Sequence, residues 1–134
     1  MSGSNTWVEL DGTSVVRKVL DGRANTVELD IAGPSGRISG VALRLYDASA
    51  RQWSIHYAPL DAGAFTPPLF GRFEHGRGEF HGADSLGGRS IFVRFVIACA
   101  TSDTCRFEQS YSDDGGRHWE VNWIATDTRL PEDR

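Results

Sequence analysis

Arg94 is the residue whose place in the sequence most clearly suggests chemistry. It is the only charge in the apolar run from Ile91 to Ala98. A charged side chain within an apolar strand needs an oppositely charged partner, a bound ligand, or a route to water. We therefore treat Arg94 as a candidate anchor for an anion or a carbonyl group. The alternatives are a structural ion pair and an exterior arginine that extends to solvent.

Glu108 is the acidic residue that could serve Arg94, and the loop between their strands decides whether it does. A two-residue loop at Ser102-Asp103 puts the two charges on opposite faces of the sheet. A three-residue loop centred on Ser102 puts Glu108 opposite Val96, on the face of Arg94. The sequence leaves both registers open.

The same loop governs Cys99 and Cys105. The shorter loop separates the two thiols onto opposite faces, and the longer one pairs them directly, close enough for a bridge only at a non-hydrogen-bonded site. Because the chain shows no export signal, we expect two free thiols. No histidine stands at ligand spacing from either cysteine, so no metal site is predicted. The chain has no P-loop and no dinucleotide fingerprint, and no cofactor is predicted.

Three side chains are candidates for moving a proton: His56, Tyr57 and His81. His56 and Tyr57 are adjacent in one strand, so only one of them can face a given side. His81 shares a face with Glu79, and the two could form a general-base couple or could be ordinary surface residues.

Large aromatic rings are the candidate walls of a binding site. Trp53, Phe92, Trp119 and Trp123 are the rings that we assign to ligand contact, although tryptophan more often serves packing. Period-two alternation predicts that Trp119, Val121 and Trp123 share one face of the last strand.

The composition excludes several classes of protein. The chain has 134 residues and a net charge of −4 without a basic run, which argues for one domain and against a nucleic-acid partner. No apolar stretch is long enough to span a membrane as a helix. The start has no secretory pattern, so a cytoplasmic location is expected. Residues 1–5 and 130–134 are expected to fray.

Short alternating runs separated by glycine-rich turns fill most of the chain. Asp21-Gly22, for example, predicts a two-residue hairpin loop. We expect an all-β antiparallel up-and-down meander that closes into a barrel of about eight to ten strands, because closure removes exposed strand edges.

Five segments in order resemble a bacterial lipocalin-like, calycin-type family of unknown function: Gly40 to Asp47, Gln52 to Ala58, Pro67 to Phe73, Gly76 to Phe80, and Trp119 to Trp123. The resemblance runs from about Trp7 to Thr128, and it implies a barrel with a central cavity and no shared catalytic motif. Two departures stand out. The family's initial segment with a Gly-x-Trp pattern is missing, and His56-Tyr57 replaces a usual aromatic pair.

The expected function is the binding of a small, largely apolar or aromatic molecule in the barrel cavity, with Arg94, Glu108 and one of His56 or Tyr57 as polar anchors. The alternative is a cofactor-free enzyme of specialised metabolism, such as natural product biosynthesis, of the cyclase or isomerase type. The strand edge left by the missing first strand could also join two copies into a homodimer.

Overall fold

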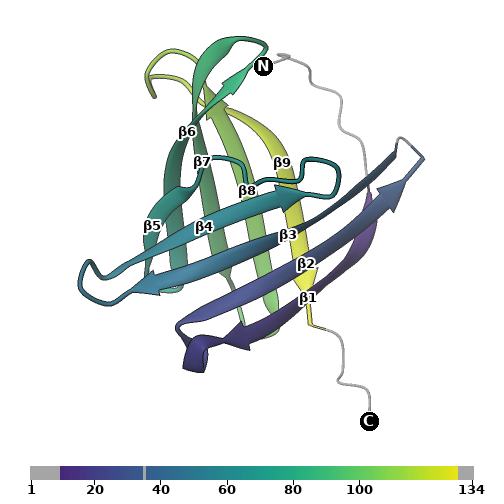
Figure 1. Ribbon diagram of the computed structural model, residues 1–134, viewed down its shortest axis with the longest axis vertical. Helices are drawn as coiled ribbons and strands as arrows, with labels where there is room; N and C mark the ends of the chain where they lie inside the picture. The colour runs from purple at the N-terminus through teal and green to yellow at the C-terminus, as the bar shows by residue number, and fades with distance from the viewer. Residues whose placement is uncertain (1–9, 35, 130–134) are drawn as a thin grey trace. The chain divides into compact units, whose positions relative to one another are not determined.

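The computed structural model describes residues 10–34 and 36–129, which contain nine β-strands and one short 3-10 turn (Figure 1). The strands are β1 (Asp11–Val19), β2 (Ala24–Gly33), β3 (Gly36–Asp47), β4 (Gln52–Pro59), β5 (Leu69–Glu74), β6 (Arg77–Leu86), β7 (Arg89–Cys99), β8 (Thr104–Ser112) and β9 (Glu120–Thr128). The prediction of an all-β antiparallel meander is confirmed. Closure into a barrel stays a prediction, and Trp7 and the two predicted frayed ends lie outside the described residues. No helix among the described residues is long and apolar enough to cross a membrane.

The chain divides into two compact units, which are described separately. The N-terminal unit ends at Phe70 and contains β1 to β4; the C-terminal unit begins at Gly71 and contains β6 to β9, with β5 starting two residues before the division. Neighbouring strands in each of these two groups are also neighbours in sequence, because every connection is a hairpin.

In the N-terminal unit, one sheet face supplies the apolar core. Val27, Ala42 and Ile55 are buried there, on neighbouring strands. The first hairpin departs from the prediction, since Leu20 to Arg23 form a four-residue loop with a 3-10 turn instead of a two-residue loop at Asp21-Gly22. Leu20 and Asp21 both take the left-handed conformation, with φ of 51° and 54°, and the Arg23 N–H donates to the Leu20 carbonyl at 3.1 Å within the loop.

In the C-terminal unit, the apolar face is built on Phe80. Its exposed fraction is 1%, and its ring packs edge-on against Phe73 with centroids 5.5 Å apart. Phe80 pairs across the sheet with Phe95, whose ring meets that of Phe107 at 4.9 Å. Residues of the same strands that alternate with these lie on the other face, which we call the Arg94 face.

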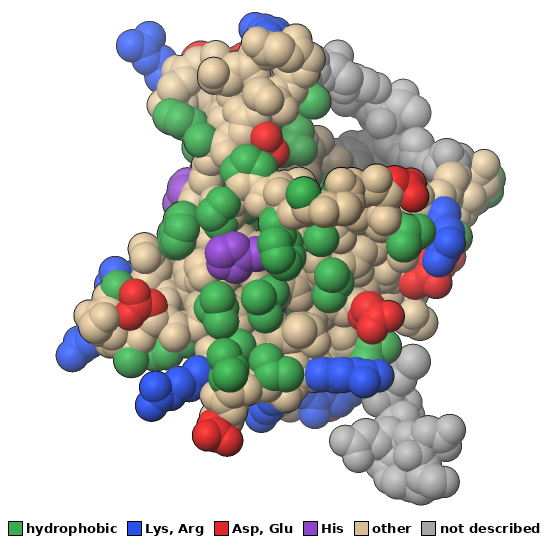
Figure 2. Space-filling model, viewed as in Figure 1, with side chains coloured by type: hydrophobic (Ala, Val, Ile, Leu, Met, Phe, Trp, Pro, Cys, Tyr) green, Lys and Arg blue, Asp and Glu red, His purple; other side chains and the backbone are tan. Residues whose placement is uncertain are grey.

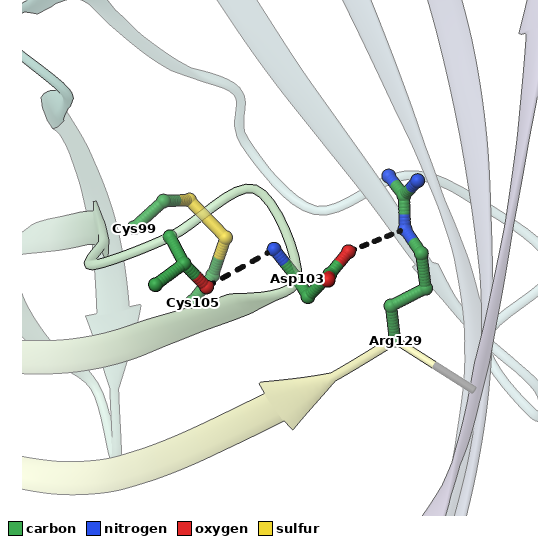
Figure 3. The surroundings of a disulfide bond; sticks show 5 residues. Cys99, Asp103, Cys105 and Arg129 are labelled. Carbon is green, nitrogen blue, oxygen red and sulfur yellow. Dashed lines mark hydrogen bonds and ion pairs between the residues drawn. A yellow bond between two sulfur atoms is a disulfide. The ribbon is translucent and has the colours of Figure 1, made fainter. Parts of the chain in front are cut away.

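A disulfide bond joins Cys99 to Cys105 (Figure 3), so the expectation of two free thiols is wrong. The hairpin has the three-residue loop, closed by a bond from the Ala100 N–H to the Thr104 carbonyl at 3.1 Å. The Cys99 N–H points away from β8 and donates to the Gly76 carbonyl at 3.3 Å. The cysteine pair therefore occupies a non-hydrogen-bonded site, where facing side chains come closest.

The tip of this disulfide hairpin is fixed to the end of β9. The Asp103 N–H donates to Thr101 Oγ1 at 3.2 Å, and the Asp103 carbonyl accepts the Arg129 N–H at 2.7 Å. The Asp103 carboxylate also lies 3.8 Å from Arg129 Nε (Figure 3). The three last strands of the C-terminal unit are thus tied together at this end.

A β-bulge interrupts the pairing of β8 with β9. Gln109 pairs with Trp123 and Ser110 pairs with Val121, so Asn122 is one residue too many. Gln109 Nε2 donates to Asn122 Oδ1 at 3.0 Å, which holds the extra residue on the face of Gln109. That face is the apolar one, because Gln109 pairs with Phe95 on β7.

The bulge places Trp119 and Trp123 on opposite faces of the sheet. Trp123 lies on the apolar face beside Gln109, whereas Trp119 contacts Arg94 and His81 on the other. The prediction that the two tryptophans share a face is therefore wrong, because a single inserted residue inverts a period-two alternation.

Candidate functional site

Three strands bring polar residues into one row on the Arg94 face. His81 on β6 pairs directly with Arg94 on β7, and Arg94 pairs directly with Ser110 on β8. Side chains that face each other across antiparallel strands have their Cβ atoms about 4.5–5.5 Å apart. Arg94 therefore lies between a histidine and a hydroxyl group, and Ser110 is buried at 1% exposure.

The guanidinium group of Arg94 lies over the indole ring of Trp119. Its central carbon is 4.4 Å from the ring centroid, a cation–π contact. Arg94 Nε is buried and has no hydrogen-bond acceptor, and within the described residues Arg94 forms no ion pair. A buried donor without an acceptor is unfavourable, and no described residue satisfies this one.

The two glutamates near Arg94 are each neutralised by another arginine. Glu79 bonds Arg77 at 2.7 Å, and Glu108 bonds Arg106 at 2.7 Å. These two Arg-x-Glu pairs lie at equivalent positions on either side of β7. Arg94 is thus a positive charge without a carboxylate partner among the described residues.

The register that brings Glu108 to the face of Arg94 is the one observed. Glu108 pairs with Val96, as the three-residue loop requires. The Glu108 carboxylate nevertheless bonds Arg106, two residues earlier on its own strand. The register alternative is settled, and the ion pair between Arg94 and Glu108 is absent from the described part of the chain.

Glu79 and His81 form a hydrogen-bonded couple beside Arg94. His81 Nε2 lies 3.0 Å from Glu79 Oε1, and the His81 ring meets the Trp119 ring edge-on at 6.1 Å. The pKa of Glu79 is lowered, first by its hydrogen bond from Arg77 and then by that from His81. Glu79 is therefore an ionised acceptor that can orient the imidazole ring.

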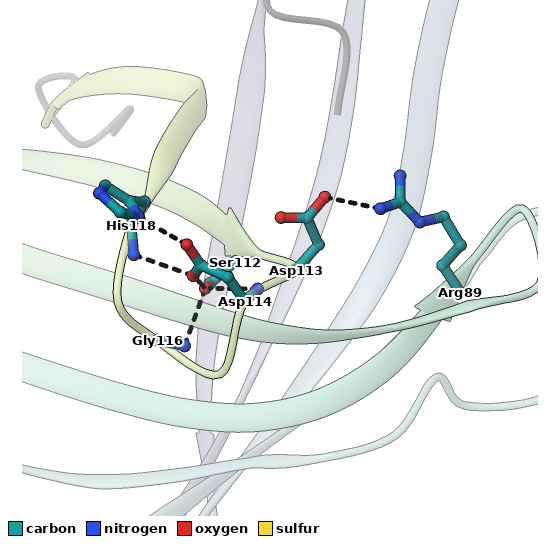
Figure 4. A network of polar contacts seen from close by, with 6 residues as sticks. All are labelled: Arg89, Ser112, Asp113, Asp114, Gly116 and His118. Carbon is teal, nitrogen blue, oxygen red and sulfur yellow. Dashed lines mark hydrogen bonds and ion pairs between the residues drawn. The ribbon is translucent and has the colours of Figure 1, made fainter.

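The loop before β9 is held by a network of polar contacts (Figure 4). Ser112 Oγ accepts the Gly116 N–H at 2.9 Å and donates to the Asp114 carboxylate at 2.8 Å. Asp114 also accepts the His118 N–H at 2.9 Å and bonds the His118 ring, and these bonds lower the pKa of Asp114 well below its usual range. Trp119 follows His118 directly, so this network fixes the backbone position from which the Trp119 side chain extends.

Phe92 extends the aromatic surface next to Trp119. It lies two residues before Arg94 on β7 and its side chain is 47% exposed. Gly116 lies against both rings, since a Cβ atom there would be 3.6 Å from Trp119 and 3.9 Å from Phe92. With φ at +90°, Gly116 also takes a conformation that other residues rarely adopt. Four of the predicted residues, Phe92, Arg94, Trp119 and His81, are thus brought together.

The other predicted residues lie elsewhere. Trp53, His56 and Tyr57 belong to β4 in the N-terminal unit. Trp53 packs against Tyr46, and the Tyr57 hydroxyl lies above Gly40, where burial raises the pKa of Tyr57.

His56 lies on the opposite face of β4 from Tyr57. Its Nε2 is 2.9 Å from Ser54 Oγ, and its ring meets Phe65 edge-on. Hydrophobic side chains gather over strands β2 to β4 in the view of Figure 2, which looks onto this region. His56 therefore has apolar and hydroxyl neighbours, and no carboxylate bonds it within the described residues.

The sequence reasoning missed Arg77 and the loop network around Asp114. A repeated Arg-x-Glu pattern, at Arg77 and again at Arg106, was the available sign that both glutamates are already neutralised. Ser112 followed by Asp114 was the sign of a side-chain-capped turn.

The known proteins add no assignment to this geometry: no family model, no curated protein and no solved structure matches the chain. Among the described residues, no group of three or more histidine, cysteine, aspartate or glutamate side chains could hold a metal ion.

Proposed function

We propose that the protein binds a small aromatic molecule carrying an acidic or carbonyl oxygen, and that Arg94 and Trp119 form the centre of its site. The observation that carries this proposal is the guanidinium group that lies on an indole ring without an acceptor in the described residues. Hydrogen bonds from arginine to a carboxylate are among the stronger ones in proteins. A ligand oxygen would supply the missing acceptor.

The aromatic part of the ligand follows from the neighbouring side chains. Phe92 is half exposed, and Trp119 presents an indole ring beside it across Gly116. Flat apolar surface next to one charged group is typical of sites for small aromatic acids. Glu108 does not act as an anchor in this proposal, because Arg106 already neutralises it. The barrel cavity and the resemblance to the lipocalin-like family stay predictions.

Benzoate is a suitable probe, with benzyl alcohol as its uncharged counterpart. We expect benzoate to bind more tightly and Arg94→Met to weaken benzoate at least tenfold, because hydrogen bonds to charged groups contribute roughly 1.5–3 kcal/mol. Calorimetric titration measures both. Arg106→Met is the matched control, since it removes an arginine from the same face whose charge is already paired. Equal losses in the two variants, or equal binding of the two probes, would contradict the proposal.

A second candidate function rests on the Glu79–His81 couple. His81 pairs directly with Arg94, so a carboxylate held by Arg94 would bring its neighbouring carbon atoms close to the imidazole ring. An oriented histidine next to an anchored carbonyl compound is the arrangement that general-base catalysis needs. We propose proton transfer at a carbon beside a carbonyl group as this second function, without a cofactor.

Phenylpyruvate in deuterated water tests the second function. The expected result is protein-dependent exchange of the protons on its CH₂ group, followed by proton NMR, and a loss of that exchange in His81→Gln. His56→Gln is the control, because His56 lies in the other unit. Exchange at the same rate in His81→Gln would remove the enzyme candidate and leave the binding proposal in place.

A further inference from the structure

The first strand has an edge that no described strand covers. All nine residues of β1 are exposed. β1 pairs with β2 along its whole length, and within residues 10–34 and 36–129 it has no other strand neighbour. Its outer edge therefore presents backbone N–H and C=O groups that none of the nine described strands pairs.

This edge lacks two of the features that usually prevent such pairing, a proline and a β-bulge. β1 contains no proline, and its register with β2 runs without a bulge. Val15, Val16 and Val19 have side chains that are 46%, 58% and 39% exposed, and they lie on both faces of the strand. A further strand at this edge would cover apolar surface on both faces.

The charges of β1 follow an order that makes the strand complementary to itself. Asp11 is at its start, and Arg17 and Lys18 are near its end. Within the described residues, neither Asp11 nor Arg17 forms an ion pair. An antiparallel second copy would set the acidic start against the basic end, whereas a parallel copy would set like charges side by side.

We propose that β1 pairs antiparallel with β1 of a second copy of this chain, in the register that sets Asp11 opposite Arg17 and Ser14 opposite its counterpart. Directly opposed residues in an antiparallel pair lie on the same face, and Asp11 and Arg17 share a face of β1. Lys18 lies on the other face and does not meet Asp11. The two-fold symmetry of this interface produces each Asp11–Arg17 contact twice.

Sedimentation equilibrium over a range of protein concentrations tests the interface at low salt. We expect a reversible dimer, and an increase of at least tenfold in its dissociation constant for Arg17→Asp, because each interface then opposes two pairs of like charges. Lys18→Asp is the matched control: it changes the net charge equally but lies on the other face, so its effect is smaller. A monomeric wild type, or equal effects of the two variants, would overturn the proposal.

Mixing two variants tests the register itself. Asp11→Arg and Arg17→Asp each self-associate weakly, but an equimolar mixture of the two is expected to dimerise as the wild type does, because opposite charges face each other again at both contacts. Far-ultraviolet circular dichroism confirms that each variant keeps its strands. A mixture that stays monomeric while both variants are folded would overturn the proposed register.

Discussion

Two histidines, one in each unit, have nearly the same local geometry and different surroundings. His81 Nε2 lies 3.0 Å from the Glu79 carboxylate, and His56 Nε2 lies 2.9 Å from the Ser54 hydroxyl. Both partners stand two residues before the histidine on the same strand, where side chains share a face.

Their contacts with aromatic rings also match, but their cross-strand neighbours do not. The ring centroids are 6.1 Å apart for His81 with Trp119 and 6.0 Å for His56 with Phe65, and both interplanar angles are 68°. Across the sheet, His81 pairs with Arg94, whereas His56 pairs with Leu43.

A single strand can provide only one part of such a site. Alternation along one strand sets a histidine beside a hydrogen-bond partner in either unit. The positive charge beside His81 is that of Arg94, which lies on a different strand. The register of β6 with β7 brings the two side chains together. The chemistry of the Arg94 face is therefore a property of pairing between strands.

The largest expected difference is in the stability that the two aromatic neighbours contribute, Trp119 beside His81 and Phe65 beside His56. Trp119→Ala is expected to lower the free energy of unfolding by about 2 kcal/mol, because it removes a partly buried ring and the cation–π contact of Arg94. Phe65→Ala removes a ring that is already 55% exposed, and its expected effect is under about 1 kcal/mol. Urea unfolding measures both. Equal losses would show that the two ring contacts are equivalent after all.

A smaller difference is expected in the response to pH. In the folded protein the pKa of Glu79 is lowered, so its contribution to stability is present above the unfolded pKa and is lost as the pH falls through the folded one. Glu79→Gln should therefore lower the free energy of unfolding by up to about 1 kcal/mol at neutral pH, and this difference should shrink in acid.

Ser54→Ala is the control for this pH effect, since a hydroxyl group has no charge to lose. Its difference from the wild type should stay constant over the same pH range, as measured by urea unfolding at each pH. A Glu79→Gln difference that also stayed constant would contradict the assignment of Glu79 as an ionised acceptor.

Sequence reasoning could predict what depends on alternation and turn chemistry. The strands, and Glu79 and His81 on one face, follow from period two. The pairing of His81 with Arg94 depends on a turn far from either residue, and the exchange of Trp123 to the apolar face depends on one extra residue at Asn122. Gly87-Gly88 marks that turn in the sequence, since both glycines take a positive φ as two-residue hairpin turns require. The extra residue at Asn122 leaves no local mark.

The disulfide illustrates the same limit. A bridge needed both a three-residue loop and a non-hydrogen-bonded pair, and the sequence allowed either loop. Because the sequence shows no export signal, free thiols were expected. The Cys99 N–H instead donates to the Gly76 carbonyl, so Cys99 and Cys105 occupy a non-hydrogen-bonded pair, which permits the bridge.

The smallest expected effect comes from giving His56 the partner that His81 has. Ser54→Glu places a carboxylate two residues before His56, on the same face of β4. If a carboxylate and a histidine two residues apart were enough to make a site, this variant would bind benzoate in the N-terminal unit. We expect no added binding, because the cross-strand neighbour is still Leu43 and offers no positive charge.

The expected change in stability of Ser54→Glu is within about 0.5 kcal/mol, because partly exposed pairs of this kind contribute little. Benzoate titration in the Arg94→Met background isolates any new site, since the proposed one is then removed. Binding that appears in Ser54→Glu/Arg94→Met, and not in Arg94→Met alone, would show that a carboxylate and a histidine on one strand are sufficient. If no benzoate binding appears, a site of this kind also needs the arginine that the register of β6 with β7 places beside the histidine.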